Sequence, residues 1–418
     1  MSDAKTESGA SKGTLMTIFS LPVIVAALGY FVDIYDLVLF SIVRVPSLKG
    51  IGITGQDLIG KGVLLLNMQM IGMLLGGILW GILGDRKGRL KIMFGSIFIY
   101  SVANLANAMV SSIEAYAALR FIAGVGLAGE LGAGITLVSE VLHKNLRGYG
   151  TMIVASVGVS GAILANFIAK SFDWRTSFVI GGILGLALLL LRLGVAESGM
   201  FKGMDKSEVR RGNFLSLFTS MDRFGRFFHS IMIGLPSWFV VGVLITFSPE
   251  FARVLNVQGA VSAGNAVMFC YLGLVFGDFA SGMMSQLLQS RRKVVLIFQG
   301  ITIAAIAVYF LCTGVSSTLF YGFCGFLGFG IGYWAIFVTV AAEQFGTNLR
   351  ATVATTVPNF VRGMTVPITL LFQLLRGPLG LFGSAICVGT LTMIVALFSL
   401  WRIQETFHKD LDYFEEYL

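Results

Sequence analysis

The chain has 418 residues, of which 56% are apolar and only 12% are charged. Soluble domains average about 45–50% apolar and about 25% charged residues, so a water-soluble enzyme and a disordered chain are both excluded. The mean hydropathy of +0.84 instead indicates a protein that crosses a membrane many times. The net charge of +8 has a simple cause in basic cytoplasmic loops, so it does not indicate a nucleic-acid partner.

Apolar segments long enough to cross about 30 Å of hydrocarbon, which takes roughly 20 helical residues, recur along the chain. We expect twelve membrane-spanning helices, over 17–43, 61–84, 92–111, 114–141, 149–170, 174–195, 227–250, 265–288, 294–313, 318–342, 351–375 and 380–402. The segment 196–226 is long and hydrophilic, and it separates two groups of six. We therefore predict an all-α membrane protein with an N-terminal bundle at 1–195, a cytoplasmic linker at 196–226 and a C-terminal bundle with its tail at 227–418.

Most Lys and Arg residues fall in the segments on the same side as the termini. This bias places both termini in the cytoplasm. Short loops and small size favour a bacterial inner membrane, and a eukaryotic membrane stays open as the alternative.

The first predicted span carries two acidic residues, Asp33 and Asp36. Their i, i+3 spacing places both carboxylates on one face of a helix. Two like charges so close in a poorly hydrated site disfavour ionisation of both, so either could carry a proton. The alternative is that the pair lies near the outer end of the span and is merely solvated.

The second span leads into a glycine-rich, basic loop with the sequence GILGDRKGRLK at 81–91. Gly81 allows close helix packing, and Gly88 permits a tight turn. Asp85 could face a helix N-terminus, while Arg86 and Arg89 would anchor the turn at the inner leaflet.

The fourth and tenth spans end in matching patterns. The fourth ends with Glu140 and Arg147, the tenth with Glu343 and Arg350, each pair separated by six residues with Asn-Leu before the Arg. Two similar halves are typical of transporters that rock around a site near the middle of the membrane. We interpret the four residues as part of a salt-bridge latch around the Asp85 loop; the alternative is static surface pairs of little energy.

Three segments carry a resemblance to a known family. The loop at 81–91 resembles the G-x-L-x-D-R-x-G-R-[RK] pattern of the major facilitator superfamily, and 120–130 is similar to the R-x-x-x-G-x-G-x-x-x-E variant of its sugar-porter and metabolite:proton symporter branches. The stretch 33–36 resembles the D-G-x-D of aromatic-acid:proton symporters, with Ile34 in place of Gly. The resemblance implies two six-helix bundles around a cavity, secondary active transport by alternating access, and a loop at 81–91 that latches the cytoplasmic side.

Further charged residues lie within the predicted spans, where each costs roughly 2.5–3.5 kcal/mol without a partner. Arg120 could neutralise Asp33 or Asp36, or bind an anionic solute. Glu130 could carry a proton, or it could form a structural ion pair within the N-terminal bundle. Asp278 and Arg362 could pair with each other, or Arg362 could bind a carboxylate through its fork of N–H groups. Around Arg362, Pro358 and Gly363 predict a broken helix that lines a cavity.

The predicted site residues form three groups. The candidates for proton coupling are Asp33, Asp36, Glu130 and Asp278. The candidates for solute binding are Arg120, Arg362, Asn67, Gln69, Asn166, Trp238, Tyr271, Tyr333, Trp334 and Asn359. The candidates for the cytoplasmic gate are Gly81, Asp85, Arg86, Gly88, Arg89, Glu140, Arg147, Glu343 and Arg350.

We therefore expect a monomeric, proton-coupled symporter of a small organic anion, whose partners are the solute, protons and the lipid bilayer. The sequence carries no nucleotide-binding loop and no metal-ligand spacing, so we expect no cofactor, no metal and no enzymatic activity. Three alternatives stay open: a facilitative uniporter of a neutral solute such as a sugar, a proton-coupled exporter, and a receptor that binds solute without transporting it.

Overall fold

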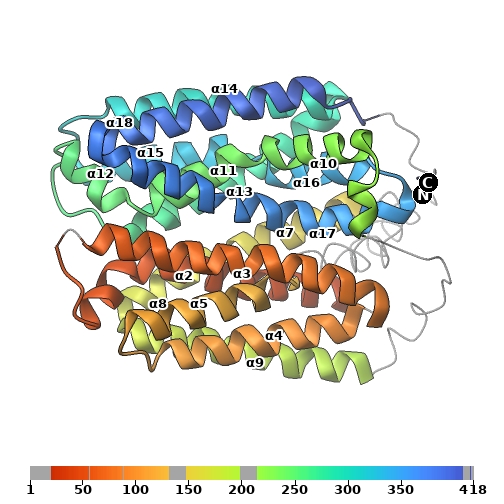
Figure 1. The fold of residues 1–418 in the computed structure, drawn as a ribbon, viewed down its shortest axis with the longest axis horizontal. Coiled ribbons are helices and arrows are strands. Elements are labelled where there is room, and N and C mark those ends of the chain that lie inside the picture. Colours follow the sequence, from red (N-terminus) through yellow and green to blue (C-terminus); the bar gives the residue numbers. More distant parts are fainter. Residues whose placement is uncertain are drawn as a thin grey trace, which may run out of the picture.

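The computed structural model describes residues 20–55, 57–87, 89–130, 147–197, 214–407 and 415. Within these ranges the chain is helical apart from turns and one isolated β-bridge between Gln258 and Ser316. Figure 1 shows long, roughly parallel helices in two groups, with the helices up to α9 in one and those from α10 onward in the other.

The N-terminal group begins with the longest apolar stretch of its half. It consists of α2 (Leu21–Gly50), α3 (Asp57–Lys87), α4 (Arg89–Asn107), α5 (Ile113–Leu127), α7 (Arg147–Val159), α8 (Gly161–Ser171) and α9 (Trp174–Glu197). The helices α7 and α8 meet at Ser160 and together cover one predicted span. The helix α2 extends well beyond the predicted end at residue 43, which becomes important for Arg44 below.

The C-terminal group is more interrupted. It consists of η1 (Phe214–Phe218), α10 (Met221–Ile233), α11 (Leu235–Phe239), η2 (Val240–Ile245), α12 (Ser248–Val254), α13 (Ala263–Leu288), α14 (Arg291–Leu311), α15 (Ser317–Gly330), α16 (Trp334–Glu343), α17 (Thr347–Gly363) and α18 (Thr365–Arg402). Irregular backbone at membrane depth is tolerated only where protein or a cavity covers it. The buried segment η2, a π-helical turn, meets this condition.

The described ranges contain nine helical stretches that are long and apolar enough to cross a membrane. One of them, Thr352–Arg402, covers two predicted spans, which are separated at Gly380 where φ is 68°. The predicted spans 92–111 and 114–141 correspond to α4 and α5, and the second extends into residues outside the described ranges. The structure therefore agrees with the predicted twelve-helix, all-α architecture.

Of the two residues predicted to break this helix, Gly363 does so and Pro358 does not. The helix α17 continues through Pro358 and ends at Gly363. Proline inside a membrane helix is tolerated when neighbouring groups satisfy the freed carbonyl, so the chain breaks at the glycine instead.

The predicted internal repeat has a counterpart in helix packing. In the N-terminal half α3 packs most extensively on α5, and in the C-terminal half α13 packs most extensively on α15. Both contacts depend on glycine: a Cβ on Gly72 would overlap the carbonyl oxygen of Phe121, and a Cβ on Gly273 would overlap that of Gly325. Small residues that let backbones touch are the usual means of packing helices in lipid.

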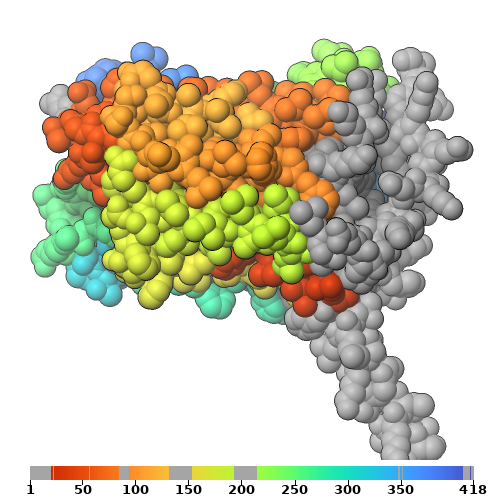
Figure 2. Space-filling model, turned by 90° about the horizontal axis from the view of Figure 1, so that it is seen from below, coloured from red at the N-terminus to blue at the C-terminus, as the bar shows by residue number. Residues whose placement is uncertain are grey.

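The outer surface of the N-terminal half is apolar, as contact with lipid requires. Figure 2 shows α4 (orange) and α9 (yellow-green) side by side on one face. Large apolar side chains on these helices are exposed, among them Phe98, Ile183 and Leu190. Charged side chains deep inside the spans, such as Asp33, Arg120 and Arg362, are by contrast buried.

Candidate functional site

A buried ion pair joins the two halves near the middle of the bundle. Asp33 lies on α2 and Arg362 on α17, and Nη2 of Arg362 is 3.8 Å from Oδ2 of Asp33. The exposed fractions are 0% for Asp33 and 1% for Arg362. Neither carboxylate oxygen of Asp33 accepts a hydrogen bond within the described part of the chain. The site therefore holds two opposite charges, one from each half, in a loose pair with spare hydrogen-bonding capacity.

Two tyrosines from opposite halves border this pair. Tyr30 on α2 and Tyr271 on α13 are both buried near Asp33 and Arg362. Tyr271 was a predicted solute contact, whereas Tyr30 was not predicted.

Asp278 does not pair with Arg362, although the sequence allowed that pairing. Its Oδ1 accepts a hydrogen bond of 3.1 Å from the backbone N–H of Ala335, at the first turn of α16. A carboxylate at a helix N-terminus is stabilised by the free N–H groups and the helix dipole there. The break between α15 and α16 creates this N-terminus, which explains why an acid is tolerated inside the span.

Glu130 has a partner, Arg192, that is not predicted from the sequence. Arg192 on α9 donates to both carboxylate oxygens of Glu130: Nη1 donates to Oε2 at 3.0 Å, and Nη2 donates to Oε1. Both side chains are buried, and the pair lies within the N-terminal group. This arrangement matches the structural ion pair that the sequence left open as an alternative.

Arg120 contacts an amide rather than a carboxylate. Its Nη2 donates to Oε1 of Gln69, while its Nε and Nη1 make no hydrogen bond with the described residues. Its guanidinium carbon lies 4.9 Å from the ring centre of Phe40 and 5.8 Å from that of Phe178. The guanidinium of Arg120 therefore packs against two aromatic rings, and two of its nitrogen atoms remain available to donate hydrogen bonds.

Asp36 is buried as deeply as Asp33, with an exposed fraction of 1%. Its Oδ1 faces α9 at Gly181, where any larger residue would overlap it. The alternative that the two acids are merely solvated at the membrane surface is therefore wrong, because the long α2 carries both into the interior.

The three predicted asparagines lie where the halves touch. Asn359 donates to the carbonyl oxygen of Ala128 at 2.9 Å. Asn67 accepts from the hydroxyl of Thr369 at 2.6 Å, and Asn166 donates to Asn265 at 3.4 Å. Each contact links the N-terminal to the C-terminal group, so these polar side chains belong to the surface that must separate and re-form if the halves rock.

The other predicted aromatic residues have mostly packing partners. The hydroxyl of Tyr333 donates to the carbonyl oxygen of Ile233 at 3.1 Å within the C-terminal half. The ring of Trp334 lies 5.2 Å from that of Phe337, and Trp238 is buried with an exposed fraction of 6%.

A second ion pair between the halves lies at the end of the bundle away from Glu415. We call this the far end, where α12 lies in Figure 1. The opposite end, where α10 begins and Arg226 contacts Glu415, is called the tail end. Nη2 of Arg44 on α2 is 2.7 and 2.8 Å from the two carboxylate oxygens of Glu250 on α12. Arg44 is fully buried and also donates to the carbonyl oxygen of Thr246 at 3.2 Å. This pair is not predicted from the sequence, because the first span is expected to end at residue 43, before Arg44.

The tail end holds the described gate residues of the C-terminal half. Glu343 pairs with Arg291 at 3.4 Å and accepts from the hydroxyl of Thr406 at 2.6 Å. Arg350 donates to the carbonyl oxygen of Phe345 at 3.4 Å. Of the N-terminal gate candidates, Gly81 lies opposite Thr356 of α17. Gly88 and Glu140 lie outside the described residues, as do the side chains of Asp85, Arg86, Arg89 and Arg147.

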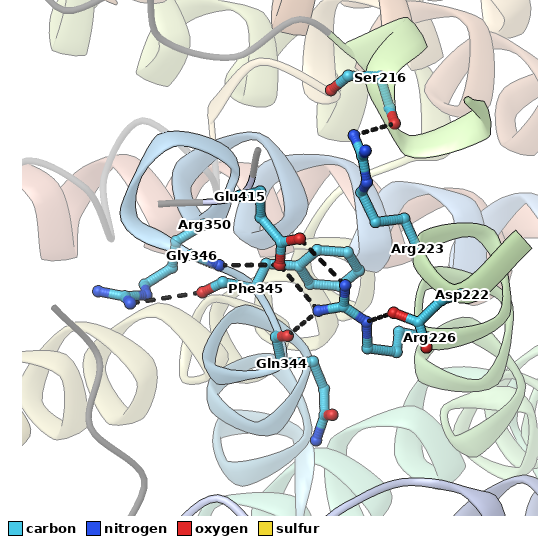
Figure 3. A network of polar contacts seen from close by, with 9 residues as sticks. All are labelled: Ser216, Asp222, Arg223, Arg226, Gln344, Phe345, Gly346, Arg350 and Glu415. Carbon is cyan, nitrogen blue, oxygen red and sulfur yellow. Dashed lines mark hydrogen bonds and ion pairs between the residues drawn. The ribbon is translucent and has the colours of Figure 1, made fainter. Parts of the chain in front are cut away.

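A polar network at the tail end ties α10 to the end of the chain (Figure 3). Arg226 donates to Glu415 at 2.8 and 3.1 Å, to the carbonyl oxygen of Gln344 at 2.5 Å and to Asp222 at 2.9 Å. Burial alone would raise the pKa of Glu415, but the hydrogen bond from Arg226 and its charge lower the pKa below its usual value. Glu415 is therefore ionised at neutral pH, and Arg226 connects the start of the C-terminal half to the tail.

Within the described ranges, no three His, Cys, Asp or Glu side chains gather as metal ligands would.

Comparison with known proteins agrees with this architecture. A niacin transporter of Acinetobacter baylyi is 26% identical over 369 residues, covering 78% of this chain and 80% of that protein. A gentisate transporter of Corynebacterium glutamicum is 26% identical over 406 residues, covering 90% and 86%. The solved structure of a proton:xylose symporter bound to 6-bromo-6-deoxy-D-glucose superposes with a TM-score of 0.70 at 18% identity, covering 96% of this chain and 98% of the other.

The match to a family is the strongest of these findings. Residues 8–363 fit the model of the Major Facilitator Superfamily, and the relatives above are transporters that cover most of this chain. The protein is thus an integral, multi-pass membrane transporter and not an enzyme, and it belongs to the Major Facilitator Superfamily.

Proposed function

We propose that the protein carries a small organic carboxylate together with a proton across a bacterial inner membrane, by alternating access between its two halves. The observation that carries this proposal is the buried Asp33–Arg362 pair, which contributes one charge from each half. The bias of basic residues supports an orientation with both termini in the cytoplasm, so that the tail end faces the cytoplasm.

The pair provides a physical reason for coupling. A buried charge that loses its partner costs about 3–5 kcal/mol, so neither Asp33 nor Arg362 is left alone at equilibrium. When a solute carboxylate accepts hydrogen bonds from the N–H groups of Arg362, Asp33 loses its counter-ion and binds a proton instead. When the solute leaves, Asp33 releases the proton and returns to Arg362. Each carboxylate therefore moves with one proton.

The substrate class follows from the second arginine. Arg120 has unused N–H donors beside the rings of Phe40 and Phe178, which suits a carboxylate attached to a flat ring. The named substrates of the relatives are of this kind: niacin and gentisate are both carboxylates on six-membered rings. These two named substrates support the proposed class of ring carboxylates.

The test is uptake into proteoliposomes that contain a trapped pH dye, at zero potential and without a pH gradient. Niacin, gentisate and xylose are added one at a time. We expect the interior to acidify with a ring carboxylate and not with xylose. Acidification by no carboxylate, with equilibration of labelled xylose, would instead favour the facilitative uniporter of a neutral solute.

A further inference from the structure

A cleft outside the transport path lies between the start of α14 and the end of α18, at the tail end. Its volume is about 580 Å³, and its lining includes Arg292, Lys293, Leu296, Leu397 and Trp401. It opens outward, because Leu296 is 53% and Trp401 66% exposed. Both helices cross the membrane, so the cleft faces lipid at the level where hydrocarbon gives way to headgroups.

Its two basic side chains have different roles. Arg292 donates to the carbonyl oxygen of Trp401 at 3.0 Å, which ties α14 to α18 and keeps the guanidinium at the cleft. Lys293 is exposed, and among the described residues no acidic side chain lies within 4.0 Å of its ammonium group. A lysine stem that lies along apolar surface while its charge reaches the headgroups is the usual arrangement at a membrane interface.

The one acidic residue in the lining, Glu405, is already engaged. Its carboxylate accepts hydrogen bonds from the backbone N–H groups of Arg291 at 2.9 Å and Arg292 at 3.2 Å, and from the hydroxyl of Ser290. Its charge is therefore matched by the N-terminus of α14 and does not cancel that of Lys293. Arg291 turns away to Ser285 and Glu343, so it does not line the cleft.

These features together describe an amphipathic site. The exposed side chains of Leu288 and Leu296 provide apolar surface for acyl chains. Trp401 is the residue type that prefers the headgroup level, and two cations lie at the polar edge. Basic pockets between membrane helices recognise phosphate headgroups through such charges. We propose that this cleft binds one anionic phospholipid, its phosphate at Lys293 and Arg292 and its acyl chains along α14 and α18.

The proposal is tested by native mass spectrometry of the purified full chain in detergent, titrated with phosphatidylglycerol or with phosphatidylcholine. We expect one phosphatidylglycerol to bind at concentrations where phosphatidylcholine does not. Lys293→Gln should weaken phosphatidylglycerol binding about fivefold, and Lys293→Gln with Arg292→Gln on the order of twentyfold, because each basic residue near a membrane contributes a similar attraction. Trp401→Ala should weaken both lipids alike.

The matched control is Lys170→Gln, which removes an exposed lysine at the far end of the bundle. It should leave lipid binding unchanged. Equal loss in Lys170→Gln and Lys293→Gln, or no loss in either cleft variant, would overturn the site. Displacement of the lipid by inorganic phosphate would overturn the lipid as occupant and leave a phosphate site. Melting temperatures of all variants confirm that they are folded, and no outcome depends on which solute is transported.

Discussion

Four of the buried arginines, which are Arg192, Arg44, Arg362 and Arg120, differ in their partners, and the partners indicate their roles. Arg192 and Arg44 each hold a carboxylate closely. Arg362 holds Asp33 loosely at 3.8 Å, and Arg120 holds only the amide of Gln69 among the described residues. A closely held ion pair favours a fixed structure. An arginine with a loose or uncharged partner can still donate hydrogen bonds to a solute carboxylate.

The Glu130–Arg192 pair should be structural, and its removal should be felt in stability. Arg192→Gln leaves Glu130 buried without a counter-ion, so we expect a loss of about 3–5 kcal/mol and a clearly lower melting temperature in detergent. Adding Glu130→Gln to this variant should restore most of the lost stability, because no uncompensated buried charge is then left. If Glu130→Gln alone abolished proton movement while stability held, Glu130 would be a proton carrier after all.

Arg120 should contribute to solute affinity through the shape of its guanidinium. In Arg120→Lys the charge stays, but the planar fork that matches a carboxylate is lost. We expect the KM for the transported carboxylate to rise about tenfold, with little change in melting temperature. Arg253→Lys, an exposed site on α12, serves as the control. An unchanged KM would remove Arg120 from the binding site.

At the scale of helices, the two glycine contacts that repeat between the halves should be sensitive to a single methyl group. Gly273→Ala places a Cβ against the carbonyl oxygen of Gly325, whereas Gly300→Ala on α14 meets open space. Overpacking costs typically 1–3 kcal/mol, and alanine otherwise favours a helix by about 1 kcal/mol over glycine. Thermal melts should therefore show Gly273→Ala destabilised and Gly300→Ala neutral or stabilised; equal melting temperatures would contradict this packing.

The ends of helices were the weakest part of the sequence prediction. Spans and their order followed from apolar length, and that part of the fold was predicted well. The predicted spans, however, stopped at charges, so Arg44 was placed just outside the first span and Glu250 at the edge of the seventh. In the structure α2 runs on to Gly50, and the charge is buried because Glu250 meets it from the other half. Only tertiary pairing makes such a charge tolerable, and one sequence does not show pairing.

For the candidate functional site, the sequence predicts which residues take part but not how they pair. Asp33, Arg362 and Asn359 were identified because polar residues inside spans are rare. Their pairing was not, since the sequence left Arg362 facing Asp278 or the solute. Arg362 pairs with Asp33 because of the way the two halves dock. Asp278 instead accepts a hydrogen bond from the N-terminus of α16.

At the scale of the whole molecule, the two inter-half pairs suggest how access alternates. The Arg44–Glu250 pair joins the halves at the far end, and the Asp33–Arg362 pair lies deeper in the bundle. Opening the far end requires the first pair to break. We therefore expect Glu250→Gln to shift the protein toward a far-end-open state.

This shift can be read from the accessibility of a reporter cysteine. Ser41 is buried beside Thr246 of the other half at 3.0 Å, so Ser41→Cys, in a Cys387→Ser background, reports separation there. Labelling by a membrane-impermeant maleimide should become at least about tenfold faster in Glu250→Gln, given the cost of an unpaired buried charge. Asp57→Asn, an exposed site at the same end, should not change the rate. Equal rates would mean that the pair is not a gate.

The central claim is that Asp33 couples solute to proton by sharing Arg362, and Asp33→Asn tests it most directly. Asparagine keeps the shape of the side chain but removes the group that releases a proton. We predict that this variant, in proteoliposomes, still exchanges labelled for unlabelled carboxylate but no longer accumulates it under an imposed pH gradient, whereas Asp57→Asn does both. Accumulation at the wild-type level in Asp33→Asn would contradict the account, because the proton would then travel by another route.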